Sequence, residues 1–300
     1  MDLSLIIVSY NTAALTCDCL HSVMAADGPE REVFVVDNAS TDSSAEIIQA
    51  RFPSIRLIAN PKNRGFSAAN NQALPLCRGR YLFFLNPDTQ VRPDAFDRAV
   101  SFMDAHPRIG LAGARIVNPD GTHEESVNCC YPGQKHSRGE LGSLPGGIAW
   151  VLGAAMIAQT ELIMKLQGFD ETFFLYGEEQ DLCLRIRKAG REIGFIEGAI
   201  VVHHGGQSEA SNSAVVMWER KIRAENLFYR KHYRPETIRR ILRSEWIRAA
   251  CRLAILRLAL SFSSDKEKVR AKLARYETIQ MITRSMAEEE RSRSRGTGKK

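Results

Sequence analysis

The chain has 300 residues, which suffices for one large α/β domain, or a domain with an appendage, and for a substantial core. Its apolar fraction of 44% and charged fraction of 25% are typical of a soluble globular protein. The net charge of +6 favours anionic partners but does not choose among phosphorylated sugars, membrane surfaces and nucleic acid. The seven cysteines are odd in number and lack paired Cys-x-x-Cys spacing, which argues against a disulfide framework and a zinc site.

The first half of the chain alternates predicted strands with predicted helices. The strands are continuous runs of Val, Ile, Leu and Phe, as expected where helices cover both faces of a sheet. We therefore predict an α/β fold with a Rossmann-like, mostly parallel, doubly wound sheet and helices on both faces. Strands are predicted at residues 5–9, 32–36, 55–58 and 80–85, and helices at 13–24, 43–51, 65–76 and 93–106.

The middle of the chain, residues 109–158, is dominated by Gly, Pro and short apolar runs. Its loop at residues 131–147 is long for a compact domain, which predicts a lid or a binding segment. Helices are predicted again at 160–166 and 179–188, and strands at 192–196 and 200–202. We expect a catalytic domain over residues 1–216, with a nucleotide-binding half at about 1–108 and an acceptor half at about 109–216.

The C-terminal part is helical in pattern and rich in Arg and Lys, so we expect a helical extension at residues 217–290 and a disordered tail at 291–300. The arginines interrupt the apolar residues too often for a transmembrane span. Two interpretations remain. The helix lies in the interface of an anionic membrane, or it packs back on the catalytic domain, which we favour slightly. The predicted apolar side comprises Ile238, Ile241, Leu242, Trp246, Ala249, Leu253, Leu256 and Leu260.

Polar residues follow the first two predicted strands, at the sheet edge where open α/β folds bind ligands. Ser9, Tyr10 and Asn11 leave backbone groups available to a nucleobase, although many strand–helix turns look similar. Asp37 could accept the N3–H of uracil or thymine. The alternative is a helix N-cap cluster, although neighbouring residues can serve as the cap. The chain lacks the Gly-rich fingerprints of dinucleotide-binding and P-loop proteins, so we expect a metal ion to hold phosphate.

Asn63, Arg64 and Gly65 open the next predicted helix, whose N-terminus and arginine attract anions, although a capped surface helix would look the same. Asp88 follows a buried strand and suits Mg²⁺, which commonly binds one or two carboxylates together with ligand phosphates. His203 follows the strand at 200–202 and would tilt the preference towards Mn²⁺.

Three acidic residues, Glu178, Glu179 and Asp181, begin a predicted helix after an aromatic run. A partly buried carboxylate with acidic neighbours can have a raised pKa and act as a general base. The alternative is a solvated acidic helix start favoured by the helix dipole.

Seven motifs between about residues 3 and 233 together resemble family 2 glycosyltransferases of the GT-A fold, in particular their rhamnosyltransferase-like branch. The resemblance implies an inverting transfer from a nucleotide-diphosphate sugar, assisted by Mg²⁺ or Mn²⁺. The motifs are Val-Ser-Tyr-Asn, Val-Asp-Asn-Ala-Ser-Thr-Asp, Asn-Arg-Gly-Phe, Leu-Asn-Pro-Asp, Gly-Phe-Asp-Glu-x-Phe-Phe, Glu-Glu-x-Asp-Leu-x-x-Arg and His-His-Gly-Gly-x-Ser.

By this resemblance, Asp37 contacts the base, Asp88 is the metal carboxylate and His203 is the second metal ligand. Glu179 is the general base, and the trailing motif positions Asp181 and Arg185 shape the acceptor and phosphate region. Two departures stand out. Asn86 replaces the first aspartate of the Asp-x-Asp motif, and the base position holds Glu instead of Asp, which leaves Glu178 as a rival.

The apolar run at residues 3–8 is too short for a signal peptide and lacks a basic n-region, and the cysteines suit a reducing setting, so we expect a cytoplasmic protein or one at the inner face of the plasma membrane. The resemblance implies an enzyme of cell-surface polysaccharide synthesis. The favoured donor is dTDP-rhamnose, and the acceptor is a glycan or a lipid-linked glycan. The alternatives are a UDP-hexose or UDP-N-acetylhexosamine donor, and a catalytically silent nucleotide-sugar-binding scaffold. We expect no nucleic-acid partner, because the basic tail carries no aromatic stacking platform.

Overall fold

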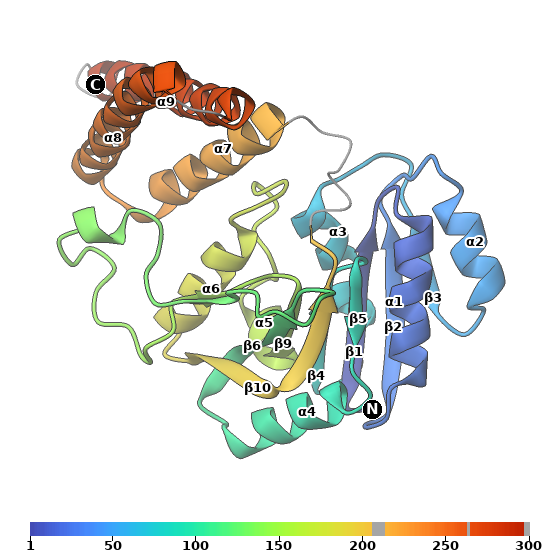
Figure 1. Cartoon of the computed structure of the whole chain (residues 1–300). Coiled ribbons are helices and arrows are strands. Elements are labelled where there is room, and N and C mark those ends of the chain that lie inside the picture. The colour runs from blue at the N-terminus through green and yellow to red at the C-terminus, as the bar shows by residue number, and fades with distance from the viewer. Residues whose placement is uncertain (206–213, 263–264, 297–300) are drawn as a thin grey trace. The chain divides into compact units, whose positions relative to one another are not determined.

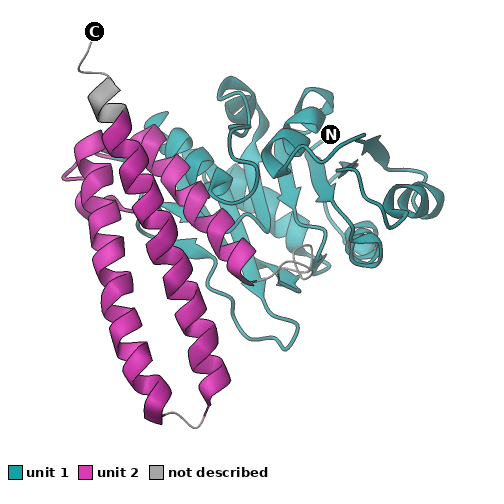
Figure 2. Ribbon diagram, turned by 90° about the horizontal axis from the view of Figure 1, so that it is seen from above, with its two compact units in different colours: residues 1–131, 144–210 teal, residues 132–143, 211–300 magenta. Residues whose placement is uncertain are grey.

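The computed structural model describes residues 1–205, 214–262 and 265–296. The chain divides into two compact units, shown in different colours in Figure 2. Unit 1 comprises Met1–Tyr131 and Leu144–Ala210, and unit 2 comprises Pro132–Ser143 and Ser211–Lys300.

Unit 1 is built on a sheet that has eight strands in the described part of the chain, in the order β3-β2-β1-β4-β9-β6-β10-β5. The strands are β1 Leu3–Ser9, β2 Arg31–Asp37, β3 Arg56–Ala59, β4 Tyr81–Leu85, β5 Thr89–Val91, β6 Ile109–Val117, β9 Ala155–Gln159 and β10 Glu192–His203. Neighbours among β1 to β4 are parallel, as is the pair of β6 and β10, so the predicted mostly parallel sheet is confirmed.

Two strands run against the others. β9 lies antiparallel between β4 and β6, and β5 pairs antiparallel with the end of β10. A parallel return needs a long crossover, usually a helix. The described segment between β6 and β9 holds only short strands and a 3₁₀ turn, so β9 enters in the opposite direction.

Helices cover both faces of this sheet (Figure 1), as the continuous apolar strands predicted. Successive side chains of β1 alternate between the faces, so Leu5 and Ile7 join one core and Ile6 and Val8 the other. The first core includes residues of α1, α2 and α4, and the second includes residues of α3, α5 and α6. These helices are α1 Ala13–Ala25, α2 Ser44–Arg51, α3 Phe66–Ala73, α4 Ala95–Ala105, α5 Thr160–Lys165 and α6 Glu178–Lys188.

Several boundaries differ from the sequence predictions. The strands expected at 192–196 and 200–202 are one strand, β10, whose register shifts between Ile196 and Ile200. The helix expected at 65–76 ends as the 3₁₀ turn Leu74–Leu76, which contains a proline that cannot donate a helical hydrogen bond.

The loop expected at 131–147 contains only the 3₁₀ turn Gln134–His136 as regular structure. It connects two short antiparallel strands, β7 (Val127–Asn128) and β8 (Trp150–Val151). Its central part, Pro132–Ser143, belongs to unit 2 by its contacts, whereas the sequence predicts it in the acceptor half of the catalytic domain.

Unit 2 consists mainly of α7 Ala214–His232, α8 Pro235–Phe262 and α9 Lys266–Gly296. α8 and α9 lie side by side as a helical hairpin (Figure 2). α9 includes the first six residues of the expected disordered tail at 291–300, and residues 297–300 lie outside the described part. None of the described helices combines the length and apolarity needed to cross a bilayer.

Candidate active site

The ends of β1 and β2 lie side by side, because Ser9 is paired with Asp37 in the strand register. The Ser9 hydroxyl is buried and 3.0 Å from the Thr16 hydroxyl of α1, so it faces the protein interior. Tyr10 is 37% exposed at the same edge. The Asn11 Oδ1 accepts a hydrogen bond of 2.7 Å from the Thr41 backbone N–H. Asn11 therefore holds the loop that follows β2.

Asp37 is a buried carboxylate, and one of its two oxygens has no hydrogen-bond partner in the part of the chain that the structure describes. Its side chain is only 3% exposed, and Oδ2 accepts a 3.0 Å hydrogen bond from the Ser40 backbone N–H. Oδ1 is buried and has no hydrogen-bond partner among the described residues. The N-cap alternative is served by Asp42, whose carboxylate accepts hydrogen bonds from the backbone N–H groups of Ala13 and Ser44. Asp37 Oδ1 is therefore available to a ligand donor at this edge.

The loop at residues 63–65 is fastened to the end of β2 by Asn38, which sequence reasoning did not single out. The buried Asn38 amide donates to Asn63 Oδ1 at 2.9 Å, and its Oδ1 accepts from the Arg64 backbone N–H at 2.9 Å. Gly65 has φ of 81°, and a Cβ there would lie 2.6 Å from the Phe174 carbonyl oxygen. Only glycine fits this close approach. The position of Asn38 directly after Asp37 was the available sequence signal.

The sequence predicts that the N-terminus of α3 binds an anion, but one of its backbone N–H groups is already hydrogen-bonded within the protein. The Phe66 backbone N–H, at the first helical position, donates to the Phe174 carbonyl at 2.7 Å. The Arg64 side chain remains exposed beside it. Arg64, rather than this N–H group, is therefore the element available to a phosphate.

Asp88 and His203 are brought together by the antiparallel pairing of β5 and β10. His203 is opposite Thr89 in the register, and the His204 backbone N–H donates to the Asp88 carbonyl oxygen at 2.9 Å. His203 Nε2 lies 3.5 Å from Asp88 Oδ1. On the other side of the ring, Nδ1 lies 3.0 Å from Oε2 of Glu124. Glu124 was missed by sequence reasoning, because no local motif marks it.

The charges around His203 determine its protonation. Burial by itself lowers the pKa of His203, but the hydrogen bonds to Asp88 and Glu124 outweigh it, so the pKa is raised overall. When the ring is neutral, donation from Nδ1 to Glu124 leaves the Nε2 lone pair facing Asp88. A carboxylate behind a histidine is the usual support of a metal-binding imidazole.

These residues fit a divalent cation. One ion with bonds of about 2.1 Å can contact both Asp88 Oδ1 and His203 Nε2. In the described part of the chain, no group of three or more His, Cys, Asp or Glu side chains could hold a metal. Water and ligand phosphates would therefore have to complete the coordination.

The acidic residues of α6 are buried, so the alternative of a solvated helix start does not apply. Glu178, Glu179 and Asp181 are 6%, 9% and 0% exposed. The backbone turns sharply before them, with positive φ at Tyr176 and Gly177.

The buried Asp181 and the half-buried Arg185 form an ion pair within α6. Arg185 Nε donates to Asp181 Oδ2 at 2.7 Å, and its terminal nitrogens donate to the carbonyl oxygens of Leu166 and Gly168. These bonds fasten α6 to the loop after α5. The geometry indicates that both side chains position the acidic turn.

Glu178 and Glu179 differ in electrostatics. Burial, and then the charge of Glu179, raises the pKa of Glu178 well above its usual value. Glu178 Oε2 has no hydrogen-bond partner among the described residues. Glu178 therefore holds its proton to a higher pH than an exposed carboxyl does, because two buried negative charges side by side are costly.

A short segment connects the acidic pair with the metal-binding turn. A Cβ built on Gly153 would lie 3.7 Å from Cβ of Glu179. The next carbonyl, of Ala154, accepts a 2.9 Å hydrogen bond from the backbone N–H of Asn86, two residues before Asp88. Residues 153–154 thus connect the segment beside Glu179 with the turn that carries Asp88.

Comparison with known proteins shows the family of the chain. The family model for glycosyl transferase family group 2 matches residues 81–264, and the model for glycosyl transferase family 2 matches residues 4–148. A curated relative, N-acetylglucosaminyl-diphospho-decaprenol L-rhamnosyltransferase of Mycobacterium tuberculosis, is 25% identical over 244 residues, which cover 71% of this chain and 79% of the relative.

Solved structures share the fold at low identity. The mannosyltransferase PcManGT from Pyrobaculum calidifontis, in complex with GDP-Man and Mn²⁺, has a TM-score of 0.60 and 16% identity over 95% of this chain and 86% of its own. TarS of S. aureus has a TM-score of 0.52 and 19% identity over 82% of this chain. The present chain spans 40% of that longer protein.

Proposed function

This chain belongs to the family 2 glycosyltransferases, and we propose that it moves a sugar from a nucleotide diphosphate to a glycan or lipid-linked acceptor with inversion at the anomeric carbon. Its fold is GT-A, with a helical C-terminal part. The observation that carries the proposal is the buried pair of Asp88 and His203, supported by Glu124 and joined through residues 153–154 to Glu179.

The nucleotide would lie at the ends of β1 and β2. Asp37 Oδ1, which is buried and lacks a hydrogen-bond partner among the described residues, would accept an N–H of the base. The exposed Arg64 would bind the diphosphate. Asp88 and His203 would hold Mg²⁺ or Mn²⁺, which would neutralise the charge of the departing diphosphate when bound.

Glu179 would accept the proton of the acceptor hydroxyl as its oxygen attacks the anomeric carbon. The new glycosidic bond forms as the bond to the diphosphate breaks, and the proton ends on Glu179. Burial and the neighbouring Glu179 raise the pKa of Glu178, so Glu178 would hold its proton more tightly than an exposed carboxyl does. The position of Glu179 beside Gly153, next to the residue that bonds to the metal-binding turn, supports Glu179 over Glu178.

We propose dTDP-rhamnose as the donor, a lipid-linked glycan as the acceptor and cell-surface polysaccharide synthesis as the setting, since the M. tuberculosis relative is named as a decaprenol-linked rhamnosyltransferase. A UDP-N-acetylhexosamine is the alternative donor, because TarS 1–349 of S. aureus was solved with UDP-GlcNAc. A lipid-linked acceptor would place the enzyme at the inner face of the plasma membrane, in contact with it through unit 2.

A donor screen tests the proposal. Thermal unfolding is followed with dTDP-rhamnose, UDP-glucose and UDP-N-acetylglucosamine, each with and without Mn²⁺, since a ligand of the native state raises the unfolding temperature. One donor should stabilise the protein in a Mn²⁺-dependent manner, and Asp88→Ala should remove that dependence. Release of free nucleotide with acceptor lipids then measures transfer. Binding without turnover on any acceptor would favour the silent scaffold.

A further inference from the structure

Helix α8 presents two apolar faces, and only one of them is covered within unit 2. The covered face is the one that the sequence pattern indicated, and it includes Ile238, Ile241, Leu242, Ala249 and Leu253, all buried. α8 lies along α9. This packing accounts for five of the eight residues of the predicted apolar side; Trp246 is 43% exposed, and Leu256 and Leu260 are half-buried. It leaves the opposite side of α8 unexplained.

The opposite side carries a second row of apolar residues, which we call the outer row: Ile247, Cys251, Ile255, Leu258 and Phe262. Their spacing of four, four, three and four residues places them on one line along the helix. Four of them are 46%, 57%, 69% and 89% exposed, from Ile247 to Phe262, and Cys251 is also exposed. A continuous exposed row of this kind marks an interaction surface more often than scattered single residues do.

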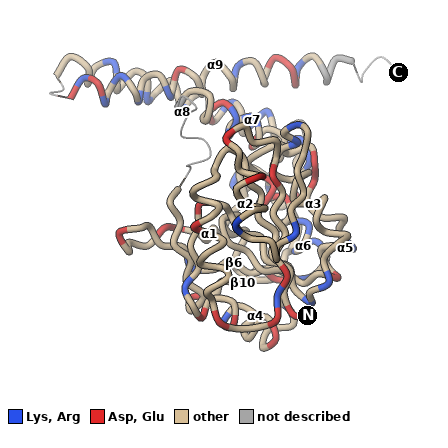
Figure 3. The backbone as a smooth tube through the Cα atoms, turned by 90° about the vertical axis from the view of Figure 1, so that its right-hand side faces the viewer, with Lys and Arg blue, Asp and Glu red and all other residues tan. Residues whose placement is uncertain are grey.

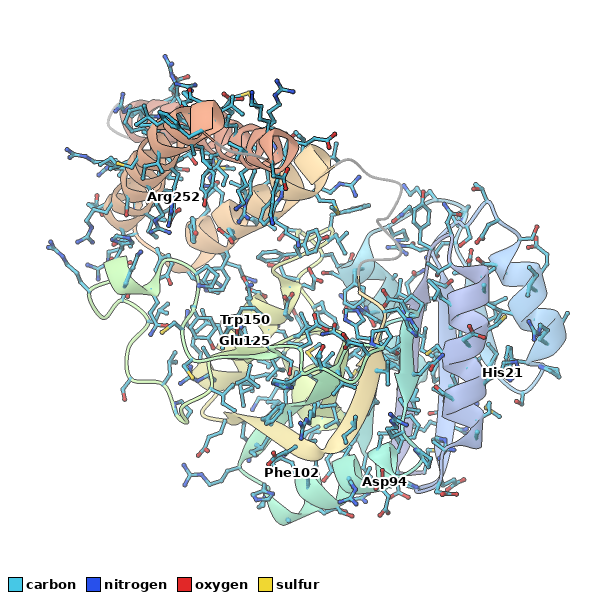
Figure 4. All side chains as sticks on the ribbon, viewed as in Figure 1. His21, Asp94, Phe102, Glu125, Trp150 and Arg252 are labelled. Carbon is cyan, nitrogen blue, oxygen red and sulfur yellow. The ribbon has the colours of Figure 1, made fainter. Side chains whose placement is uncertain are left out.

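Arginines flank the outer row on both sides. At 100° per residue, Arg248 and Arg252 lie on one flank, and Arg243 and Arg257 lie on the other. Arg248 and Arg257 form exposed ion pairs with glutamates, whereas Arg243 and Arg252 form none among residues 214–262 and 265–296. Figure 4 labels Arg252, and Figure 3 shows Lys and Arg positions among the overlapping helices α8 and α9. Long arginine stems can cover apolar surface while the charged end reaches a polar layer.

The positive charges of the flanking arginines indicate which kind of partner could cover the outer row. If a second copy of the chain covered it, the arginine flanks of two equivalent helices would meet, and like charges at an interface are unfavourable. An anionic lipid surface presents negative headgroups to both flanks and acyl chains to the row. An apolar stripe with basic flanks is the pattern of helices that lie in the membrane interface.

We propose that the outer row of α8 docks on an anionic phospholipid surface, with Ile255, Leu258 and Phe262 immersed among the lipids and Arg243 and Arg252 bound to headgroups. This rests on the proposed function only in that a lipid-linked acceptor would be met at such a surface. It assigns membrane contact to the side of α8 opposite to the face that the sequence pattern indicated.

Flotation of the full chain with lipid vesicles tests the proposal. The chain should bind vesicles of phosphatidylcholine with phosphatidylglycerol, and bind pure phosphatidylcholine much less. The variant Ile255→Gln/Leu258→Gln/Phe262→Gln should reduce the partition coefficient at least about tenfold, because glutamine retains helix propensity without apolar side-chain burial. Arg243→Gln/Arg252→Gln should reduce binding to the anionic vesicles about tenfold or more and leave binding to neutral vesicles unchanged.

The matched control replaces three exposed apolar residues of unit 1, which are 45–49% exposed, as Met24→Gln/Leu76→Gln/Met164→Gln, and should bind as the unaltered chain does. Phe262→Gln alone is the second variant if the triple variant folds poorly. Equal binding by outer-row and control variants would overturn the proposal, as would absent binding by the unaltered chain. Light scattering that shows a dimer lost only in the outer-row variant would assign the row to a second copy instead.

The same preparations are also assayed for thermal stabilisation by dTDP and UDP with Mn²⁺. Vesicle binding without nucleotide binding would contradict the proposed function and leave the docking surface standing. Nucleotide binding that persists in a variant which no longer binds vesicles would support both.

Discussion

Glu178 and Glu179 occupy one helical turn in a buried site, where two adjacent negative charges are costly. Glu179→Gln removes the proton acceptor and preserves the size of the side chain. Transfer should fall by a factor of about 10² to 10⁴, the usual contribution of a general base, while the donor still raises the unfolding temperature. Turnover by nucleotide release and thermal unfolding measure the two effects. Retained turnover would exclude Glu179 as the base.

The raised pKa of Glu178 has a consequence for stability. The folded chain holds this proton more tightly than the unfolded chain, so stability falls as the pH rises above the usual carboxyl range. Each pH unit within that window costs about 1.4 kcal/mol. Glu178→Gln imitates the protonated form, so its free energy of unfolding should lack this decline and exceed that of the unaltered chain at neutral pH. Urea unfolding across pH measures it, and parallel pH curves for the two proteins would contradict the assignment.

Glu124 acts on the metal site through His203. Glu124→Gln removes the negative charge that orients the imidazole, so the affinity for Mn²⁺ in the presence of a nucleoside diphosphate should fall about 10- to 100-fold. Electron paramagnetic resonance of free Mn²⁺ measures this without requiring activity. Glu125→Gln is the matched control, because Glu125, labelled in Figure 4, is exposed next to it. Equal losses in both variants would argue against a specific role of Glu124.

At the scale of elements, Asn38 connects the end of β2 with the loop at residues 60–65, and no short sequence motif includes both segments. Its side chain satisfies groups of residues 60, 63, 64 and 65, beyond the ends of β2 and β3. Asn38→Ala leaves buried polar groups unpaired, which should cost about 1–3 kcal/mol of unfolding free energy and weaken donor binding. Denaturant unfolding and donor titration measure the two losses. Asn118→Ala, at a surface turn, is the control, and equal stability of both variants would contradict the role of Asn38.

Elements were predictable where their pattern is local. The apolar runs of β1, β2 and β4 and the alternation with helices follow from neighbouring residues, and all of these elements were found within a few positions. No strand is predicted from the sequence at β5, β6 or β9, and the union of the two last strands into β10 is not foreseen. These features depend on which distant strands pair with one another. The residues of an apolar strand do not indicate whether its neighbour in the sheet runs parallel or antiparallel.

At the scale of the whole molecule, the chain leaves unit 1 after Tyr131 and returns to it at Leu144. The segment between them, Pro132–Ser143, is hydrogen-bonded to the residues around the start of α8. The Glu140 carboxylate accepts hydrogen bonds from the Arg234 backbone N–H and the Thr237 hydroxyl at the start of α8. The Tyr233 hydroxyl donates to the Pro132 carbonyl at 2.7 Å. All of these hydrogen-bonded residues belong to unit 2.

Glu140→Ala should therefore destabilise unit 2 by about 1 kcal/mol, the usual loss for a helix cap, and leave the donor-induced stabilisation of unit 1 unchanged. Scanning calorimetry with and without donor resolves the two responses. Glu236→Ala, also at the start of α8 but exposed, is the control. A loss of donor stabilisation in Glu140→Ala would show that this segment serves the donor site.

The sequence by itself determined the fold class, the family and the positions of the carboxylates after the strands, because these are encoded in short runs of adjacent residues. Only the tertiary structure decided which acidic group retains its proton, which glutamate supports His203 and which face of α8 is covered. The physical reason is that burial and pairing depend on residues far apart in the chain. Glu124 and His203, for example, are 79 positions apart in the chain, yet Oε2 of Glu124 lies 3.0 Å from Nδ1 of His203.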